Sequence, residues 1–455
     1  MTAHEYWTTD LARLEDAVGG QVLTPGNEDY ERSRRVFNAM IDRYPAVIVR
    51  CVDMTDVVHG IEFAGQHGLP VSVKGGGHSV AGSAVADAGL TLDMTAMTRI
   101  VVDPVQQVAV AEPGLTLAQF DAATAAHGLA TTLGAVSMTG IAGLTLGGGL
   151  GWLNGHYGLA CDNLLAVNIV TADGQLRTAS AQQHEDLFWA VRGGGGNFGV
   201  VVSFTYRLHP VTTVLAGGIT YPTEVAQAAL SRYHELAVTS PDELSTGASV
   251  KLDEAGDPVV SVTVCWSGSS EEAEAAVRPF RELGASVSDE VRPVPYVALQ
   301  QAGDGTFPVG RQHYWKSSFL RQLPAEAIET VLRHTAQAPS PHTTVGFQQM
   351  TGVASRVDPA ATAFAHRAEQ YDFLILSQWD DPADSPANIA WTRSLFEAMQ
   401  PFLEPSVYMN NLGDEGPIRV RAAYGTNYDR LAQVKATYDP DNLFRFNPNI
   451  VAAQT

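Results

Sequence analysis

Three clusters of glycine constrain what this chain can bind more than any other feature of its sequence. They occupy residues 75–77, directly before His78 at the end of an apolar run, residues 139–151, and residues 193–199. A glycine inside a strand costs roughly 0.5–1 kcal/mol in backbone entropy. Tight turns would explain one such cluster, but they explain three poorly. We therefore expect backbone from all three clusters to line one long or phosphate-bearing ligand, with N–H groups turned toward its anionic part.

The clusters do not match the common nucleotide-binding motifs. Gly194, Gly196 and Gly199 have the GxGxxG spacing, but a helical pattern precedes them and a strand pattern follows. The dinucleotide fingerprint needs the opposite order, a strand and then a helix. The clusters at 75–77 and 139–151 lack the Gly-Lys-Ser/Thr ending of a P-loop. The pattern therefore disfavours both a nicotinamide Rossmann site and a P-loop.

Composition excludes several classes of partner. The 49 acidic and 28 basic residues give a formal charge of -21, which disfavours nucleic acid and anionic membrane surfaces. The three cysteines have no CxxC spacing, so neither a disulfide framework nor a zinc site is indicated. We find no apolar run of about 18 residues and no signal-peptide pattern, so a cytoplasmic location is the expectation.

The first half of the chain alternates strand and helix patterns. Residues 45–51 and 70–76 are strand-like, and residues 55–68 between them predict a helix opened by Thr55 and ended by Gly68. This order predicts a β-α-β unit. Thr116 is predicted to cap a second helix, over 116–128.

The pattern changes near residue 210. Longer alternating strands and helices without glycine clusters follow, as expected for a second α+β domain. A chain of 455 residues fits about two or three domains. The pattern predicts a first domain over 1–210, a second domain over 211–405 whose sheet could face a ligand, and a structured end over 406–455.

Taken together, the motifs resemble the FAD-linked oxidases of the berberine-bridge-enzyme-like group, in the vanillyl-alcohol-oxidase superfamily. The resemblance covers about residues 40–212 and 405–450 and rests on an ordered set of segments: VKGGGHSVAG, AGLTLDMTAM, AEPG, GGLGWLNGHYGLACDN, VTADG, EDLFWAVRGGGGNFGVV and KATYDPDNLFRFNPNI. It implies an α+β fold. The resemblance implies a PCMH-type FAD-binding domain of two subdomains over 1–210, to which the C-terminal segment over 406–455 returns. It implies a substrate-binding domain over 211–405 whose antiparallel β-sheet is covered by helices.

The resemblance implies that FAD is bonded covalently to His78. A neutral imidazole is a good nucleophile near neutral pH, and the flavin methyl group is electrophilic. Many members also bond a cysteine to the flavin. Aligning the YGLA-x-DN and GGG-x-G segments of this chain with the family places that cysteine's position at Gly140. We therefore expect a single attachment through His78, no cysteinyl bond, and a packing role for Cys161.

Further FAD contacts carry over where the motifs match. The family assigns them to the pyrophosphate loop, the ring, the second glycine loop, the adenine side and the C-terminal end: Lys74, Gly75, Gly76, Gly77, His78, Ser79 and Gly82; Pro113 and Gly114; Ser137, Thr139, Gly140, Gly143 and Gly147; Val200; Asn447 and Asn449. Lys74 replaces the arginine common at its place and lacks the bidentate fork of arginine.

The resemblance also implies the reaction. The flavin takes a hydride from a substrate C–H while a base removes an O–H or N–H proton, and oxygen then reoxidises the flavin with release of peroxide. The family's Y-x-N motif matches Tyr408 and Asn410, with Asn411 where an aromatic residue is common. A phenol with a pKa near 10 needs neighbours that stabilise phenolate. Tyr408 as base and Tyr408 as an orienting or packing residue both remain open.

Residues 311–319 and 347–350 fall where a substrate-facing strand is expected. Alternation brings Gln312, Tyr314 and Lys316 to one face and His313 and Trp315 to the other. The first three and Gln348 are predicted to face substrate, although ordinary half-buried strands explain them as well. No metal site is expected, because no ligand-spaced partner accompanies His313.

The sequence thus predicts an FAD-dependent oxidoreductase, an oxidase of a small organic or natural-product-like alcohol, hemiacetal, phenol or amine. A flavin-binding carrier or sensor without turnover, and a dehydrogenase with another electron acceptor, are the alternatives. The expected partners are a small-molecule substrate and O2. The substrate's identity and the oligomeric state are not predicted.

Overall fold

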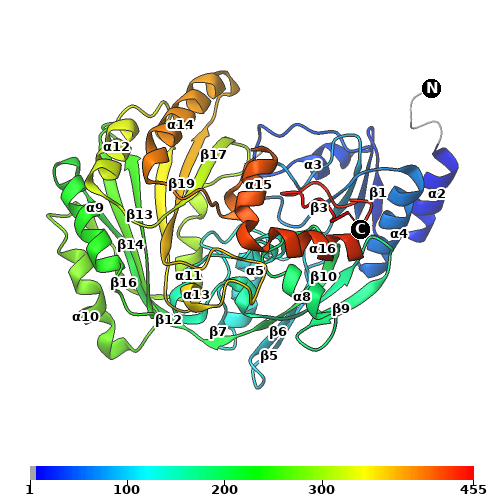
Figure 1. The fold of residues 1–455 in the computed structure, drawn as a ribbon, viewed down its shortest axis with the longest axis horizontal. Helices are drawn as coiled ribbons and strands as arrows, with labels where there is room; N and C mark the ends of the chain where they lie inside the picture. The colour runs from blue at the N-terminus through cyan, green and yellow to red at the C-terminus, as the bar shows by residue number, and fades with distance from the viewer. Residues whose placement is uncertain (1–6, 414, 455) are drawn as a thin grey trace.

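The computed structural model describes residues 7–413 and 415–454, and its sheets divide the chain into two parts that face each other (Figure 1). A four-stranded and a five-stranded sheet lie at one end, and an eight-stranded sheet lies at the other. The chain passes between them after β10 (Val200–Arg207), where β11 (His209–Pro210) pairs with β7 (Leu129–Ala130) before β12 (Thr213–Tyr221) begins.

The four-stranded sheet contains the predicted β-α-β unit. Its strands, in spatial order, are β1 (Gln21–Leu23), β2 (Val47–Arg50), β4 (Leu90–Asp93) and β3 (Val71–Lys74). Helix α4 (Met54–His67) connects β2 to β3, and β4 lies between these two strands, parallel to both. Gly68 ends α4 in the left-handed region, as predicted. The predicted N-cap was wrong, because the carboxylate of Asp53, not Thr55, accepts the N–H groups of the first turn.

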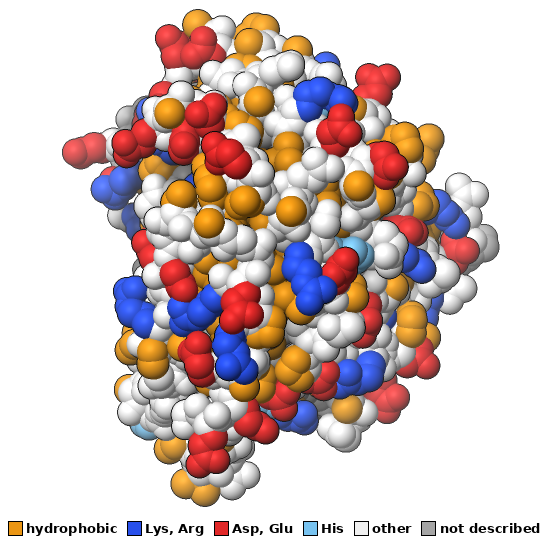
Figure 2. Space-filling model, turned by 90° about the vertical axis from the view of Figure 1, so that its left-hand side faces the viewer, with side chains coloured by type: hydrophobic (Ala, Val, Ile, Leu, Met, Phe, Trp, Pro, Cys, Tyr) orange, Lys and Arg blue, Asp and Glu red, His pale blue; other side chains and the backbone are white. Residues whose placement is uncertain are grey.

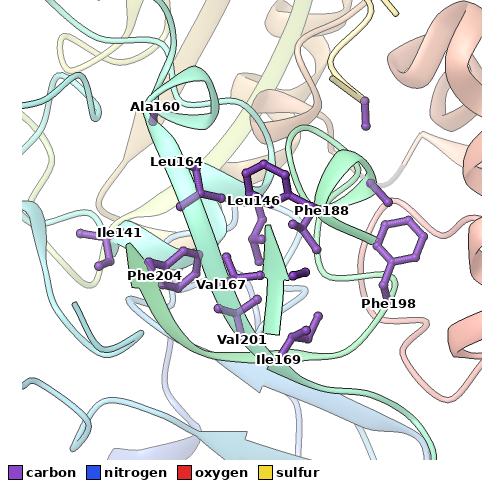
Figure 3. Close-up of a cluster of buried hydrophobic side chains, with 14 of the residues drawn as sticks. Ile141, Leu146, Ala160, Leu164, Val167, Ile169, Phe188, Phe198, Val201 and Phe204 are labelled. Carbon is purple, nitrogen blue, oxygen red and sulfur yellow. The ribbon is translucent and has the colours of Figure 1, made fainter. Parts of the chain in front are cut away.

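The five-stranded antiparallel sheet carries the second and third glycine clusters. Its spatial order is β5 (Ile100–Asp103), β6 (Val108–Ala111), β10, β8 (Leu164–Val170) and β9 (Leu176–Ser180). The helices on this side are α5 (Leu117–Ala125), α6 (Ile141–Leu146), α7 (Asn154–Tyr157) and α8 (Glu185–Ala190). Thr116 caps α5 with a capping box to Gln119, as its sequence predicted. Apolar side chains from α6, α8, β8 and β10 meet in one buried cluster (Figure 3). This packing holds the glycine loops before α6 and after α8 on one side of the sheet.

The eight-stranded sheet is antiparallel throughout. Its main path is β15 (Ser288–Asp289), β12, β14 (Pro258–Trp266), β13 (Leu244–Leu252), β18 (Thr344–Met350), β19 (Gln370–Trp379) and β17 (Gln312–Leu320), with β16 (Arg292–Pro295) also paired to β12. Four helices cover its outer face: α9 (Thr223–Ala237), α10 (Ser270–Arg281), α12 (Ala325–Thr335) and α14 (Ser385–Met399). Figure 2 shows this end of the molecule, where acidic, basic and apolar side chains are interspersed. The other face of the sheet is turned toward the glycine loops.

The end of the chain returns to the first part. After α14, helices α15 (Gly416–Tyr424) and α16 (Tyr428–Tyr438) pack beside α8 and the five-stranded sheet (Figure 1). The side chain of Asn197, in the third glycine cluster, donates to the carbonyl of Pro448 and accepts the N–H of Ile450. The last residues are thereby fixed against this glycine loop.

Candidate active site

A cavity of about 470 Å³ lies between the glycine loops and the inner face of the large sheet. Backbone from all three glycine clusters lines it, as the sequence predicted. The opposite wall comes from the large sheet and from the segment after α14. Fourteen predicted site residues line the cavity: Gly75, Gly76, Gly77, His78, Ser79, Pro113, Thr139, Gly140, Gly143, Val200, Gln348, Tyr408, Asn410 and Asn447. Their individual roles stay predictions.

The first two glycine clusters touch each other. A Cβ added to Gly76 would lie 2.4 Å from the nitrogen of Gly140, and a Cβ added to Gly140 would lie 2.4 Å from the nitrogen of Gly76. Neither residue can carry a side chain on this backbone. Glycine is therefore required here by contact between the loops as well as by any ligand, and no cysteine fits at position 140.

The loop at residues 75–79 presents free hydrogen-bond donors. Within the described part of the chain, no group accepts a hydrogen bond from the N–H groups of these five residues. Five successive unpaired N–H groups beside a cavity are suited to an anion such as a phosphate. Since no Lys or Arg side chain lines the cavity in the described part of the chain, a phosphate there would depend on backbone donors. The glycine loops and their free donors fit FAD.

His78 lines the cavity close to Asp304. Burial lowers the pKa of His78 to about 4, and the carboxylate of Asp304 opposes this shift only in part. The imidazole is therefore neutral at pH 7. A neutral imidazole has a free lone pair, as a nucleophile requires.

Lys74 does not line the cavity, and its predicted place near the pyrophosphate stays a prediction. Its Nζ donates to the carbonyls of Ser33 (2.7 Å) and Arg35 (3.0 Å) and lies 3.9 Å from the carboxylate of Asp93. Burial lowers its pKa. The ammonium group fixes the N-terminal segment to the end of β3.

Five more predicted FAD contacts lie off the cavity: Gly82, Gly114, Ser137, Gly147 and Asn449. Three of them are glycines with crowded surroundings. A Cβ would lie 2.7 Å from the side chain of Ile41 at Gly82, 2.1 Å from the carbonyl of Met94 at Gly114, and 1.9 Å from the side chain of Asn410 at Gly147.

The other two residues are Ser137 and Asn449. Ser137 donates its hydroxyl and its N–H to Asp304. The buried side-chain oxygen of Asn449 has no donor within the described residues. None of these five residues lines the cavity.

Tyr408 places its hydroxyl oxygen among three N–H donors. The backbone N–H groups of Gly149 (2.9 Å) and Leu150 (3.2 Å) and the amide of Asn410 (2.8 Å) all donate to it. The amide of Asn410 also donates to the carbonyl of Leu144, which fixes its direction. Burial raises the pKa of Tyr408 above its ordinary value, while the three donors oppose the rise.

The face of strand β17 that lines the cavity is the opposite of the predicted one. Trp315 lines the cavity, whereas Gln312, Tyr314 and Lys316 do not. The hydroxyl of Tyr314 accepts from Arg393 of α14, and Lys316 pairs with Glu415 at 2.9 Å. Alternation separates the two faces of a strand, but it does not say which face α14 covers. Of the four predicted substrate-facing residues, only Gln348 borders the cavity.

Several cavity residues were not predicted. They are apolar or aromatic side chains from several separate segments: Phe37, Phe307, Trp315, Leu374, Leu376 and Met409. Asn411 also lines the cavity and donates to the buried carboxylate of Asp372 at 2.5 Å. Burial raises the pKa of Asp372 to about 6. Asn411 therefore anchors the Tyr408–Asn410 segment to β19.

Cys161 lies outside the cavity and is fully buried among Leu150, Phe364 and Tyr408. Burial raises the pKa of its thiol. Within residues 7–413 and 415–454, no group of three or more His, Cys, Asp or Glu side chains is placed to hold a metal ion. Over the same residues, no helix has the length and apolar character to cross a membrane.

Known proteins share both the sequence and the architecture. A family model described as "FAD binding domain" matches residues 45–180, and one described as "Berberine and berberine like" matches residues 407–451. An FAD-linked oxidoreductase of Dictyostelium discoideum is 31% identical over 444 residues, covering 96% of each chain. The (R)-6-hydroxynicotine oxidase of Paenarthrobacter nicotinovorans is 31% identical over 454 residues, covering 95% of this chain and 97% of its own.

Among solved structures, 6-hydroxy-D-nicotine oxidase from Arthrobacter nicotinovorans has a TM-score of 0.88 at 29% identity, covering 95% of this chain and 98% of its own. The BBE-like 1 protein of Physcomitrella patens has a TM-score of 0.89 at 21% identity, covering 98% of this chain and 99% of its own. At that identity the likeness concerns the fold alone. These similarities confirm the predicted fold class.

Proposed function

Because the chain belongs to the FAD-linked oxidoreductases of the berberine-like family, we propose that it oxidises a small, largely apolar substrate at a carbon that bears an O–H or N–H group. The hydride goes to FAD, Tyr408 takes the proton, and dioxygen is the final electron acceptor. One observation carries this proposal: three N–H donors converge on the hydroxyl oxygen of Tyr408 at the wall of the cavity.

Three donors suit a phenolate better than a phenol. A neutral tyrosine oxygen has two lone pairs, whereas the anion has three. The groups around Tyr408 therefore stabilise the form that can accept a proton. They supply the phenolate-stabilising neighbours that a tyrosine base requires. Because burial raises the pKa, Tyr408 is protonated in the resting protein at neutral pH, and activity should increase with pH.

Chain groups on the cavity wall would hold the cofactor. The N–H groups of residues 75–79 would bind its phosphates, and Gly140, Gly196 and Asn447 would line its path. FAD, when bound, supplies the hydride acceptor. His78, neutral and without a hydrogen-bond partner within the described residues, would be the covalent attachment point.

The cavity lining supports a substrate with little charge. No Asp, Glu, Lys or Arg side chain lines it in the described part of the chain, and Phe307, Trp315, Leu374 and Leu376 form an apolar wall opposite the glycine loops. Gln348, Tyr408, Asn410 and Asn411 supply polar groups on that side. This lining favours an aromatic or heteroaromatic alcohol, phenol or amine over an oligosaccharide, which would need many polar partners. The likeness to a hydroxynicotine oxidase supports the same class.

The test is anaerobic reduction of the flavin by a substrate panel. Aromatic amines, benzylic alcohols and oligosaccharides are added to the purified holoprotein, and bleaching of the flavin band is followed. We expect bleaching by a member of the first two classes, followed by peroxide release when oxygen is admitted. Bleaching by oligosaccharides alone would overturn the substrate class. Reoxidation by a dye but not by oxygen would overturn the oxidase assignment.

Covalent attachment of the flavin to His78 is tested on the denatured protein. Flavin that stays with the chain in acid, and is lost in His78→Ala, is the expected result. Flavin on a peptide containing Cys161 would contradict it.

A further inference from the structure

The imidazole of His78 belongs to a stack of three rings. The ring of Phe37 lies 4.1 Å from that of His78 at an interplanar angle of 17°, and 4.2 Å from that of His313 at 26°. Two rings stacked this closely on one phenyl ring must lie on its opposite faces, since they would otherwise overlap. Phe37 is therefore enclosed between an imidazole from the first glycine loop and an imidazole from β17.

Hydrogen bonds fix the central ring to both parts of the molecule. The N–H of Phe37 donates to the carbonyl of Gly77 (3.0 Å), and the amide of Asn38 donates to the carbonyl of Val80 (2.8 Å). These two bonds hold the glycine loop on either side of His78. The Asn38 side chain also exchanges two 3.0 Å hydrogen bonds with the backbone of His313. Asn38 is almost completely buried.

His78 is stacked on Phe37 and held by no hydrogen bond of its imidazole within the described residues. Within the described residues, neither nitrogen of its imidazole has a hydrogen-bond partner, although the ring borders the cavity. A hydrogen bond accepted by the lone-pair nitrogen would occupy its lone pair and lower its nucleophilicity, whereas a stacked neighbour fixes the ring plane and leaves that lone pair free. This arrangement suits a residue that must form a bond through nitrogen.

We propose that Phe37 is a positioning residue for attachment of the flavin to His78, and that attachment depends on the docking of β17 against the first glycine loop. The inference rests on the proposed function, in which His78 carries the cofactor.

A nitrogen of His78 forms a C–N bond with the methyl carbon on the benzenoid side of the flavin, that carbon loses one hydrogen, and the imidazole loses its N–H proton. The flavin ring takes up the two electrons and two protons, and dioxygen removes them as hydrogen peroxide.

The experiment follows attachment directly. Full-length apoprotein is mixed with FAD, and acid-stable flavin on the chain is measured over time by gel fluorescence and intact mass. The dissociation constant for FAD is measured before attachment proceeds. We expect Phe37→Leu to slow attachment on the order of 10- to 100-fold, since small misplacements of a reacting group have effects of this size. The dissociation constant should change much less.

Matched variants separate positioning from general packing. Phe37→Tyr and His313→Phe keep an aromatic stack and should attach flavin near the wild-type rate. Phe63→Leu removes another buried phenylalanine, which contacts Trp7 and His67 on the far side of α4, and should leave attachment unchanged.

Two results would overturn the inference while leaving attachment at His78 intact: a wild-type rate in Phe37→Leu, or equal losses of attachment rate and FAD affinity. Wild-type protein without acid-stable flavin would instead refute attachment at His78 and the inference with it.

Discussion

Tyr408 and His78 are both buried at the cavity, and burial affects their expected roles in opposite ways. Burial disfavours the charged form of each, so it raises the pKa of Tyr408 and lowers that of His78 to about 4. The neutral form of His78 is the nucleophile, so burial favours its role. The anionic form of Tyr408 is the base, so burial opposes its role, and the three N–H donors offset this effect.

Tyr408→Phe tests whether the hydroxyl group takes the proton. We expect anaerobic single-turnover flavin reduction to fall by on the order of 10²–10⁴-fold, the usual contribution of a general base. FAD binding should be unchanged, because the phenyl ring remains. Tyr206→Phe is the control, since this buried hydroxyl bonds to Thr145 away from the cavity. Unchanged reduction in Tyr408→Phe would assign Tyr408 to orientation or packing.

Asn410→Ala tests the donors by pH dependence. In the proposed function the deprotonated form of Tyr408 is the base, so the rate should rise with pH in the wild type. Losing one donor to the anion raises the pKa of Tyr408 further, so the variant has less base at neutral pH. A hydrogen bond to a charged group contributes about 1.5–3 kcal/mol, which predicts a loss of roughly 10- to 100-fold at pH 7. In flavin-reduction measurements the deficit should stay constant while the pH is below the raised pKa of Tyr408, because both rates then rise in parallel, and it should shrink only above that pKa. A wild-type rate that does not rise between pH 7 and 10.5 would count against this role.

At the scale of elements, two loops and one strand decide the shape of the site. The periodicity of the first half correctly predicted α4, α5 and their flanking strands, because those patterns are local. The facing of β17 was not predictable, since it depends on α14, about 70 residues further on. The hydrogen-bond partners of Lys74 were equally unpredictable, because Ser33 and Arg35 come from a segment with no periodic pattern. Phe37 and Asn38 were missed for the same reason.

Gly140→Ala tests the contact between the two glycine loops. Its Cβ would lie 2.4 Å from the nitrogen of Gly76, so the loops must separate. We expect a loss of about 1–3 kcal/mol in the free energy of unfolding, as for other overpacked sites, together with weaker FAD binding. Urea unfolding and FAD titration measure the two effects.

Gly65→Ala is the matched control. A Cβ at this position on α4 has no atom within 4 Å, so this variant should be as stable as the wild type or slightly more stable. A Gly140→Ala protein as stable as Gly65→Ala would show that the two loops can separate without loss.

At the scale of the whole molecule, the cavity exists only because distant segments meet. The first glycine loop, the inner face of the large sheet and the C-terminal segment each supply one wall. The sequence predicted that the end of the chain would return, because the KATYDPDNLFRFNPNI segment matches the same family as the glycine loops. It did not predict what would hold that segment in place. Asn197 and a buried ion pair at the C-terminal end of α16 hold it there.

The ion pair joins Lys435 to Asp439, 2.6 Å apart and with both side chains fully buried. Lys435 also donates to the carbonyls of Asn197 and Phe444, so it links the third glycine loop to the cavity-lining C-terminal segment. Lys435→Met would leave the Asp439 carboxylate buried without a cation. Such a change typically costs about 3–5 kcal/mol.

We expect Lys435→Met to lower the free energy of unfolding by about this amount and to weaken FAD binding, because Phe444 and Asn447 line the cavity beyond the pair. The double variant Lys435→Met, Asp439→Asn should recover part of the stability, since no unpaired charge remains. Urea unfolding of the apoprotein and FAD titration provide the two measurements. If the single variant unfolds within about 0.5 kcal/mol of the wild type, as ordinary surface substitutions do, the pair does not hold the C-terminal wall of the cavity.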